Sequence, residues 1–121
     1  MNKDNNKVIA KASFVRMSPR KLRLVVDAVR NLSIDSAIAN LKALNKRAAS
    51  EILKVLQQAM GNAKNNFKMS PADLKIGSMI VGEGPRSKRS DRHAHGARFG
   101  GGIRHKRSAH VIVELTSKNG Q

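Results

Sequence analysis

Hydrophobic and polar positions alternate along two segments of this chain, residues 8–14 and 109–116. Strict alternation is typical of half-buried β-strands, because successive side chains of a strand point to opposite faces. In the first segment, Phe14 is expected on the same apolar face as Val8. The apolar, β-branched run at residues 74–81 predicts a third strand.

Between the predicted strands at residues 8–14 and 74–81, apolar residues recur every three or four positions, which indicates amphipathic helices. The first helix is predicted from Pro19 to Arg30, with Ser18 as its N-cap. Ser33 has the character of a second N-cap, and that helix is expected to end near Asn45.

A third helix is predicted to begin near Lys46 and to fade in the polar stretch 65–68. Gly61 lies inside its apolar pattern, where glycine is about 1 kcal/mol less favourable than alanine. We expect Gly61 either to allow the close approach of another element or to mark a fraying last turn. The following segment, residues 70–73, predicts a turn or a single helical turn.

The order of elements is therefore strand, three helices, strand, long connection, strand. Helices and strands that do not alternate favour an α+β fold, with three helices on one face of a small three-stranded antiparallel sheet. The length of 121 residues suits one domain. We expect a body formed by residues 7–83 and 108–117, and an arm formed by residues 84–107.

The arm is unusual in composition. It contains a single acid, Asp91, and its only large apolar residues are Phe99 and Ile103. Its eight cations are Arg86, Lys88, Arg89, Arg92, Arg98, Arg104, Lys106 and Arg107. Such a segment is either a solvated, disordered loop or a continuation of its two flanking strands into a long hairpin.

The hairpin alternative projects far from the body. Each leg of about 13 residues reaches roughly 40 Å at ~3.3 Å per residue, whereas a body of about 90 residues has a radius of gyration near 12 Å. An isolated two-stranded ribbon is marginally stable, and facing like charges weaken it further. We therefore expect a phosphate backbone outside the chain to order the arm.

The overall charge supports a polyanionic partner. The chain has 24 Lys and Arg against 8 Asp and Glu, a formal net charge of +16. It has no Cys, no apolar run near the ~20 residues of a membrane span, and an N-terminus unlike a signal peptide. The expected compartment is the cytoplasm or an organelle that makes the protein itself. With no Trp or Tyr, stacking of splayed bases is not expected to dominate recognition.

A second basic group is predicted at the start of the first helix. It consists of Arg16, Arg20, Lys21, Arg23 and Arg30. Cations near a helix N-terminus oppose the helix dipole, so we expect them to serve phosphate binding together with free backbone amides. The alternative is a simple solubilising charge.

Other chemistries find little support. His93 and His95, with His105 and His110, lack a further ligand at a fixed spacing, so no metal or cofactor is expected. No Gly-rich nucleotide loop and no paired carboxylates stand out, so we do not expect an enzyme. The basic segments lack the apolar face of a membrane-active protein. A nucleoid-type or regulatory protein that grips nucleic acid with a basic β-arm is the main alternative function.

Four collinear stretches then point to one family. They are MSPRKLRLVVDAVR (17–30), NKRAASEILKVLQQAMGNAKNN (45–66), VGEGPRSKR (81–89) and HKRSAHVIVEL (105–115). Together the chain resembles the bacterial-type ribosomal protein twenty-two family of the large subunit. The resemblance implies the α+β fold with an extended basic β-hairpin, and a role in translation as part of a ribonucleoprotein. The implied partners are large-subunit rRNA, neighbouring large-subunit proteins and, near the hairpin tip, the nascent peptide in the exit tunnel.

The resemblance also assigns residues. With the basic positions above, the predicted RNA-binding set is Arg16, Ser18, Pro19, Arg20, Lys21, Arg23, Arg86, Lys88, Arg89, Arg92, Arg98, Arg104, Lys106, Arg107 and His110. The predicted tunnel tip is Arg92, His93, Ala94, His95, Gly96, Ala97 and Arg98. Here the sequence departs from the family's usual Pro-Arg-Ala-x-Gly-Arg-Ala run. The resemblance implies a ribosome-bound protein of the cytoplasm or of an organelle, and no homo-oligomer.

Overall fold

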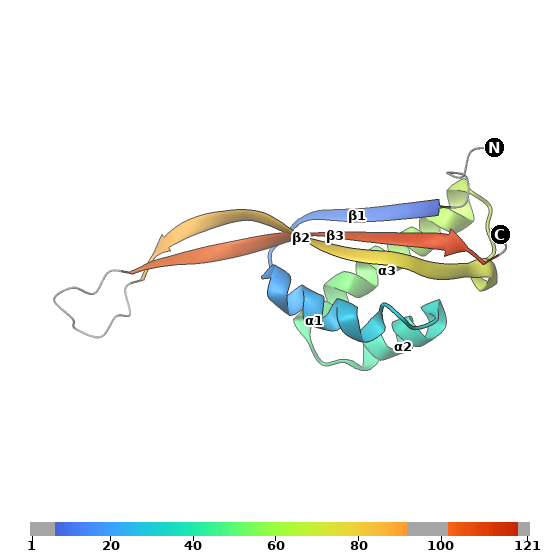
Figure 1. The fold of residues 1–121 in the computed structure, drawn as a ribbon, viewed down its shortest axis with the longest axis horizontal. Helices are drawn as coiled ribbons and strands as arrows, with labels where there is room; N and C mark the ends of the chain where they lie inside the picture. The colour runs from blue at the N-terminus through green and yellow to red at the C-terminus, as the bar shows by residue number, and fades with distance from the viewer. Residues whose placement is uncertain (1–6, 92–101, 119–121) are drawn as a thin grey trace.

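The structure, a computed structural model, describes residues 7–91 and 102–118. The elements in chain order are β1 (Lys7–Val15), α1 (Pro19–Val29), α2 (Ile34–Ala43), α3 (Arg47–Asn66), the 3₁₀ turn η2 (Pro71–Asp73), β2 (Leu74–Ser90) and β3 (Ile103–Ser117). Figure 1 shows a body with a two-stranded ribbon extending from one end. The predicted α+β fold is confirmed.

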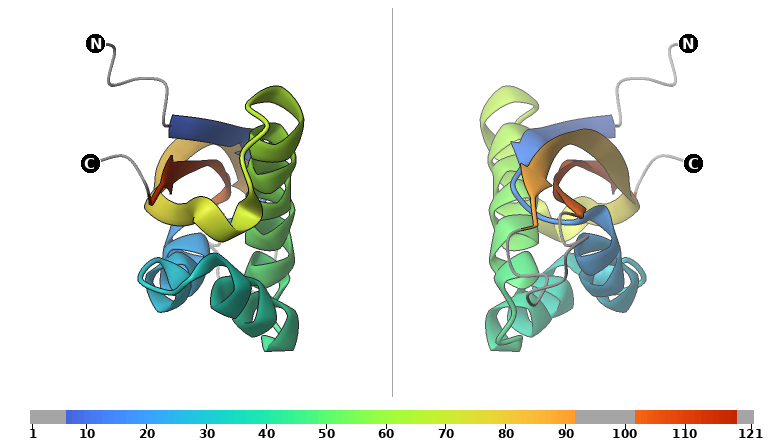
Figure 2. Two further views of the ribbon diagram at one scale, coloured as in Figure 1. Left: turned by 90° about the vertical axis from the view of Figure 1, so that its right-hand side faces the viewer. Right: turned by 90° about the vertical axis from the view of Figure 1, so that its left-hand side faces the viewer.

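The three strands form one antiparallel sheet in the order β1-β3-β2. The helices lie on one face of this curled sheet, as the end-on views in Figure 2 show. The predicted alternation in β3 is confirmed, because Val111, Val113 and Leu115 are 0% exposed. On the facing side, Leu22 of α1 and Ile52 of α3 are also 0% exposed and belong to the same core.

Phe14 does not lie on the core face as predicted; 65% of its surface is exposed. The pairing of β1 with β3 shifts between Ala12 and Val15, and Phe14 has a positive φ of 57°. This irregularity reverses the side on which Phe14 emerges. Its backbone N–H donates to Nδ1 of His110 over 3.1 Å, and the two rings meet edge to face at 5.0 Å.

The helix boundaries are close to the predicted ones. Ser33 caps α2, with its hydroxyl accepting from the Ser36 N–H at 3.4 Å. The helix ends before Asn45, with Leu44 already extended. α3 continues through the polar stretch to Asn66.

Neither expectation for Gly61 holds. A Cβ built at Gly61 meets nothing within 4 Å, so no element approaches closely. The helix continues for several residues beyond it, so it does not mark a fraying end.

Beyond the core, β2 and β3 continue as the predicted extended hairpin. Their pairing runs from Arg86 opposite Arg107 to Ser90 opposite Ile103. We call this part, residues 85–90 and 103–107, the ribbon; all of its residues are exposed.

The ribbon leaves the body at a bulge between Glu83 and Arg86. The Ser108 hydroxyl donates to the Pro85 carbonyl over 2.8 Å at this point. A Cβ on Gly84 would lie 2.5 Å from the Ser108 Oγ and 3.0 Å from its carbonyl carbon. The close approach of the two strands therefore requires glycine at position 84.

Candidate nucleic-acid interface

A groove of about 1110 Å³ lies where the ribbon meets the body. Its walls come from the β1–α1 connection, α1, the start of α3 and both legs of the ribbon. Seven cations line this groove, which we call the basic groove: Arg16, Lys21, Lys46, Arg47, Arg89, Lys106 and Arg107. No Asp or Glu belongs to the described lining. The basic groove therefore joins the two basic regions that the sequence predicted separately.

The ribbon presents cations on both of its faces. Side chains of residues opposite each other in an antiparallel pair emerge on the same face. Lys106 and Arg89 emerge on one face and line the basic groove, whereas Arg86 and its partner Arg107 emerge on the other. Arg86 and Arg107 line a smaller hollow of about 260 Å³ with Arg20, Arg23 and Glu83, and Arg107 also belongs to the basic groove. The ribbon can therefore contact anions on both sides.

Like charges face each other across the ribbon. Arg86 lies opposite Arg107, and Arg89 lies opposite Arg104. Facing like charges destabilise a strand pair. A bound polyanion would remove this repulsion.

Two acids reduce the repulsion in part. Arg86 pairs with Glu83 at 3.1 Å, and Arg104 pairs with Asp91 at 3.0 Å. Both arginine side chains remain at least half exposed. The Arg86–Glu83 pair is exposed on both sides, so it contributes little stability and does not compete strongly with a phosphate.

Arg16, Arg20 and Lys21 are exposed at the start of α1, as predicted. This helix has no acid in its first turn, and Ser18 makes no side-chain cap bond. The same description applies to α3, which begins at Arg47 and has Lys46 as its N-cap. In contrast, α2 has both a bonded Ser33 cap and an acid, Asp35, in its first turn. Among the helices of the described residues, the two that begin at the basic groove are thus the two whose N-terminal ends lack acids and side-chain caps.

Sequence reasoning missed Lys46 and Arg47. The signal was present, because a Lys-Arg pair directly before a helical pattern parallels the Arg-Lys pair after Ser18. The role of the pair becomes apparent only in the structure, because the fold places Lys46 and Arg47 in the groove lining together with residues of α1 and the ribbon.

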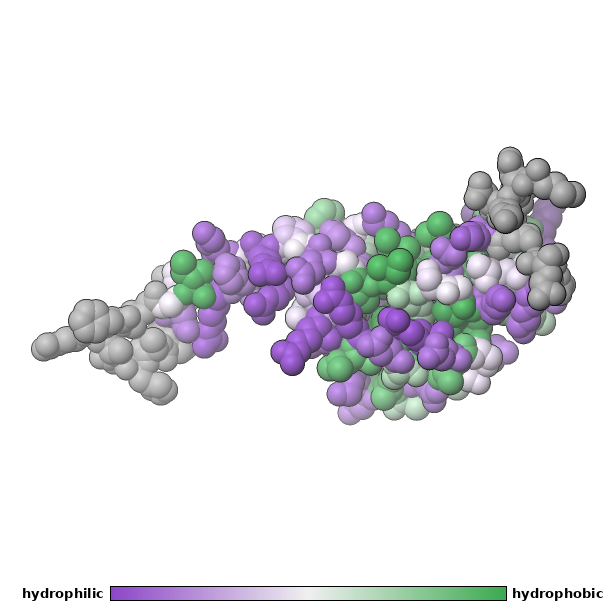
Figure 3. All heavy atoms as spheres, in the orientation of Figure 1, coloured by the Kyte–Doolittle hydropathy of each residue, from purple (hydrophilic) through white to green (hydrophobic). Residues whose placement is uncertain are grey.

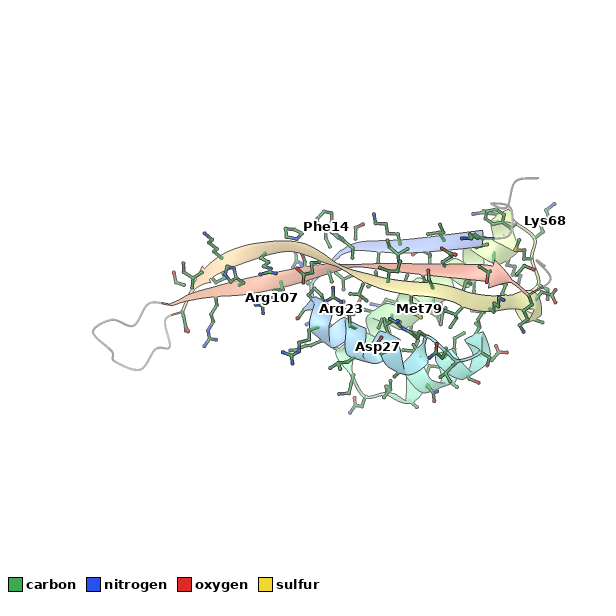
Figure 4. All side chains as sticks on the ribbon, viewed as in Figure 1. Phe14, Arg23, Asp27, Lys68, Met79 and Arg107 are labelled. Atoms are coloured by element: carbon green, nitrogen blue, oxygen red, sulfur yellow. The ribbon has the colours of Figure 1, made fainter. Side chains whose placement is uncertain are left out.

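Arg23 and Arg30 differ from the simple cluster predicted at the start of α1. Arg23 lies near the junction of α1 with the sheet in Figure 4, and its Nη2 donates to the Val81 carbonyl of β2 over 3.1 Å. It therefore helps to hold α1 against the sheet. Arg30 was assigned to the wrong end, because it follows α1 and pairs with Asp27 at 2.8 Å.

His110 is half-buried on β3, and its Nδ1 already accepts the Phe14 N–H. His105 lies on the ribbon opposite Lys88. Within residues 7–91 and 102–118, no three His, Asp or Glu side chains gather closely enough to hold a metal ion. In the same described ranges, no helix has the length and apolar character needed to cross a membrane.

Several predicted residues lie outside the described ranges. They are Arg92 and Arg98 of the RNA-binding set and the whole predicted tip, Arg92, His93, Ala94, His95, Gly96, Ala97 and Arg98.

The surface view shows where hydrophilic and hydrophobic side chains gather. On the face shown in Figure 3, hydrophilic side chains dominate the ribbon and the adjoining end of the body, and hydrophobic surface gathers over the body. A projecting basic ribbon beside a basic groove is suited to a polyanion that spans both.

Known proteins are similar to this sequence over most of its length. The family model described as ribosomal protein L22p/L17e matches residues 10–116. Proteins named large ribosomal subunit protein uL22 are 43% identical in Mycoplasma capricolum and 40% identical in Halothermothrix orenii, each over 109 residues. These alignments cover 90% of this chain and 96% and 94% of the two relatives. The chain therefore belongs to the ribosomal protein L22p/L17e family.

Proposed function

We propose that this protein is a structural constituent of the large ribosomal subunit that binds large-subunit rRNA through the basic groove and the ribbon. The observation that carries the proposal is the groove lining of seven cations and no described acid, shared between body and ribbon. The family supports the partner, since its relatives are named as large ribosomal subunit proteins. Catalysis has no place in this function.

The body and the arm have separate roles in this proposal. The body, residues 7–83 and 108–117, carries the core and anchors the protein on rRNA during assembly. The arm, residues 84–107, has no core side chain among its described members and reaches into the particle. Its tip is proposed to lie at the nascent-peptide exit tunnel, with neighbouring large-subunit proteins around the body. The setting is then the ribosome, in the cytoplasm of a bacterial cell.

Incorporation of variants into large subunits tests this division. Arg16, Arg20 and Lys21 changed together to Glu should impair entry into large subunits, because repulsive charges then face the rRNA at the anchoring site. We omit Arg23 from this variant because its bond to Val81 supports the fold. Deletion of residues 92–102 should still enter large subunits and should change how the tunnel handles nascent chains.

The measurement is the amount of each variant in purified large subunits relative to wild type. Circular dichroism of the free variants controls for folding. Exclusion of the deletion together with normal incorporation of the triple Glu variant would reverse the assigned roles. If the wild-type protein and both variants all fail to enter large subunits, the result would favour a nucleic-acid-binding protein that acts elsewhere.

A further inference from the structure

The lining of the basic groove has an apolar part, which we call its floor, beside the seven cations, which we call its rim. The apolar residues of its lining are Phe14, Met17, Leu24, Val25, Ala28, Leu44, Ala48 and Pro85. Leu24 is 69% exposed, although its neighbours Leu22 and Val25 are buried in the core. Phe14, which is 65% exposed, lines the same groove. Two large exposed apolar side chains in one groove form a surface that a partner with an apolar face would stabilise by covering it.

The charge of the rim limits what that occupant is. An amphipathic peptide would need several acids to match seven cations. The backbone of an intact RNA helix would satisfy the cations, but it would leave the floor against water. A nucleotide turned out of its helix offers both chemistries, because its base is flat and largely apolar on its faces and its flanking phosphates are anionic.

The kinds of cation favour a base as well. Four of the seven are arginines, Arg16, Arg47, Arg89 and Arg107. The planar guanidinium stacks on bases and binds phosphate, whereas the lysine ammonium acts mainly as a point charge. The chain has no Trp or Tyr, so the stacking platforms in the groove are the exposed Phe14 ring, the arginine planes and the aliphatic side chains.

We propose that the basic groove holds an unstacked nucleotide of rRNA, with its base against Leu24 and its flanking phosphates on the cations of the rim. The inference rests on the proposed function. It adds to the backbone contacts of the ribbon a site that takes up a base. It is compatible with recognition led by charge, because the contact is confined to one place.

Truncation of Leu24 separates this contact from general RNA binding. The variant Leu24→Ala removes apolar surface and leaves every charge in place. Its matched control is Ile80→Ala, which truncates another exposed aliphatic side chain, 54% exposed, that lies outside the groove lining. Both positions are exposed, so both variants should fold normally.

The assay is footprinting of each protein on a transcript of the large-subunit rRNA, with dimethyl sulfate for adenine and cytosine bases, a carbodiimide for uracil and guanine bases, and hydroxyl radicals for the backbone. Wild type should protect the base of a nucleotide that the free transcript leaves unpaired. Leu24→Ala should restore its reactivity, keep the backbone footprint and weaken affinity about three- to tenfold. Ile80→Ala should match wild type.

The outcomes distinguish this inference from the function beneath it. Unchanged base protection by Leu24→Ala, with a normal backbone footprint, overturns this inference alone. Absence of any wild-type footprint overturns the proposed function together with it. Because the chain has no Cys, a photo-crosslinker on Leu24→Cys gives a second readout in assembled subunits. A crosslink to rRNA supports the site, and a crosslink to a neighbouring protein assigns the groove to a peptide instead.

Discussion

Neutralising three cations of the basic groove should reduce both the affinity for rRNA and its dependence on salt. The variant changes Arg47, Arg89 and Lys106 together to Gln. These residues line one groove but come from α3, β2 and β3, so the variant tests whether the three elements contact the RNA together. All three side chains are exposed, so the fold should persist.

The magnitude follows from counterion release. Each phosphate contact contributes about 0.7 to 0.9 to the slope of log affinity against log salt. Loss of three contacts should therefore make the slope shallower by about 2 to 3. At 0.1 M salt this corresponds to a loss of roughly 100- to 500-fold in affinity, and at 0.5 M salt the loss shrinks to roughly fivefold.

Filter binding to a large-subunit rRNA fragment across a salt series measures both quantities. The matched control changes Lys42, Lys64 and Lys75 to Gln, which removes the same charge from exposed positions outside the groove lining. The control should keep the wild-type slope within about one unit. Equal slopes for the two triple variants would show that net charge alone drives binding, and the assignment of the basic groove would then be wrong.

Two further comparisons test the fold that presents this site, each by urea unfolding of the free protein. Gly84→Ala should destabilise the base of the ribbon by about 1–3 kcal/mol, because the new Cβ meets the Ser108 backbone at 3.0 Å. Gly61→Ala should stabilise α3 by about 0.5–1 kcal/mol, because its Cβ meets nothing within 4 Å. Destabilisation by both variants would contradict this account of the two glycines. Arg23→Ala should lower the free energy of unfolding by about 1–2 kcal/mol, because the hydrogen bond to the β2 backbone is lost. The control Arg20→Ala should change the free energy of unfolding by less than about 0.5 kcal/mol. Equal effects of the two variants would refute a structural role for Arg23.

The sequence predicted those features that depend on local periodicity. The spacing of Leu22, Val25 and Val29 places all three on one face of α1, and all are buried. The alternation in β3 was equally readable, because a strand packed on one side must alternate. The composition of the arm, with almost nothing to bury, pointed to a projection from the body.

Features that depend on distant partners could not be predicted. Phe14 faces outward because its N–H meets His110, 96 positions later in the chain. Arg23 acts on the fold because Val81 lies beside it only after α1 docks on the sheet. The apolar floor of the groove likewise brings together Leu24 and Pro85, which belong to different elements. No local pattern carries such information.

β3 is both the central strand of the body and one leg of the ribbon, and this limits how the protein can change in length. The core residues Val111 to Leu115 fix which way every β3 side chain faces, and uninterrupted pairing from Arg86 opposite Arg107 onward extends that choice along the ribbon. One residue added to a single leg would turn the side chains beyond it to the opposite face, moving Arg89 or Lys106 away from the groove. Viable length variants of the ribbon should therefore gain or lose residues in both legs together.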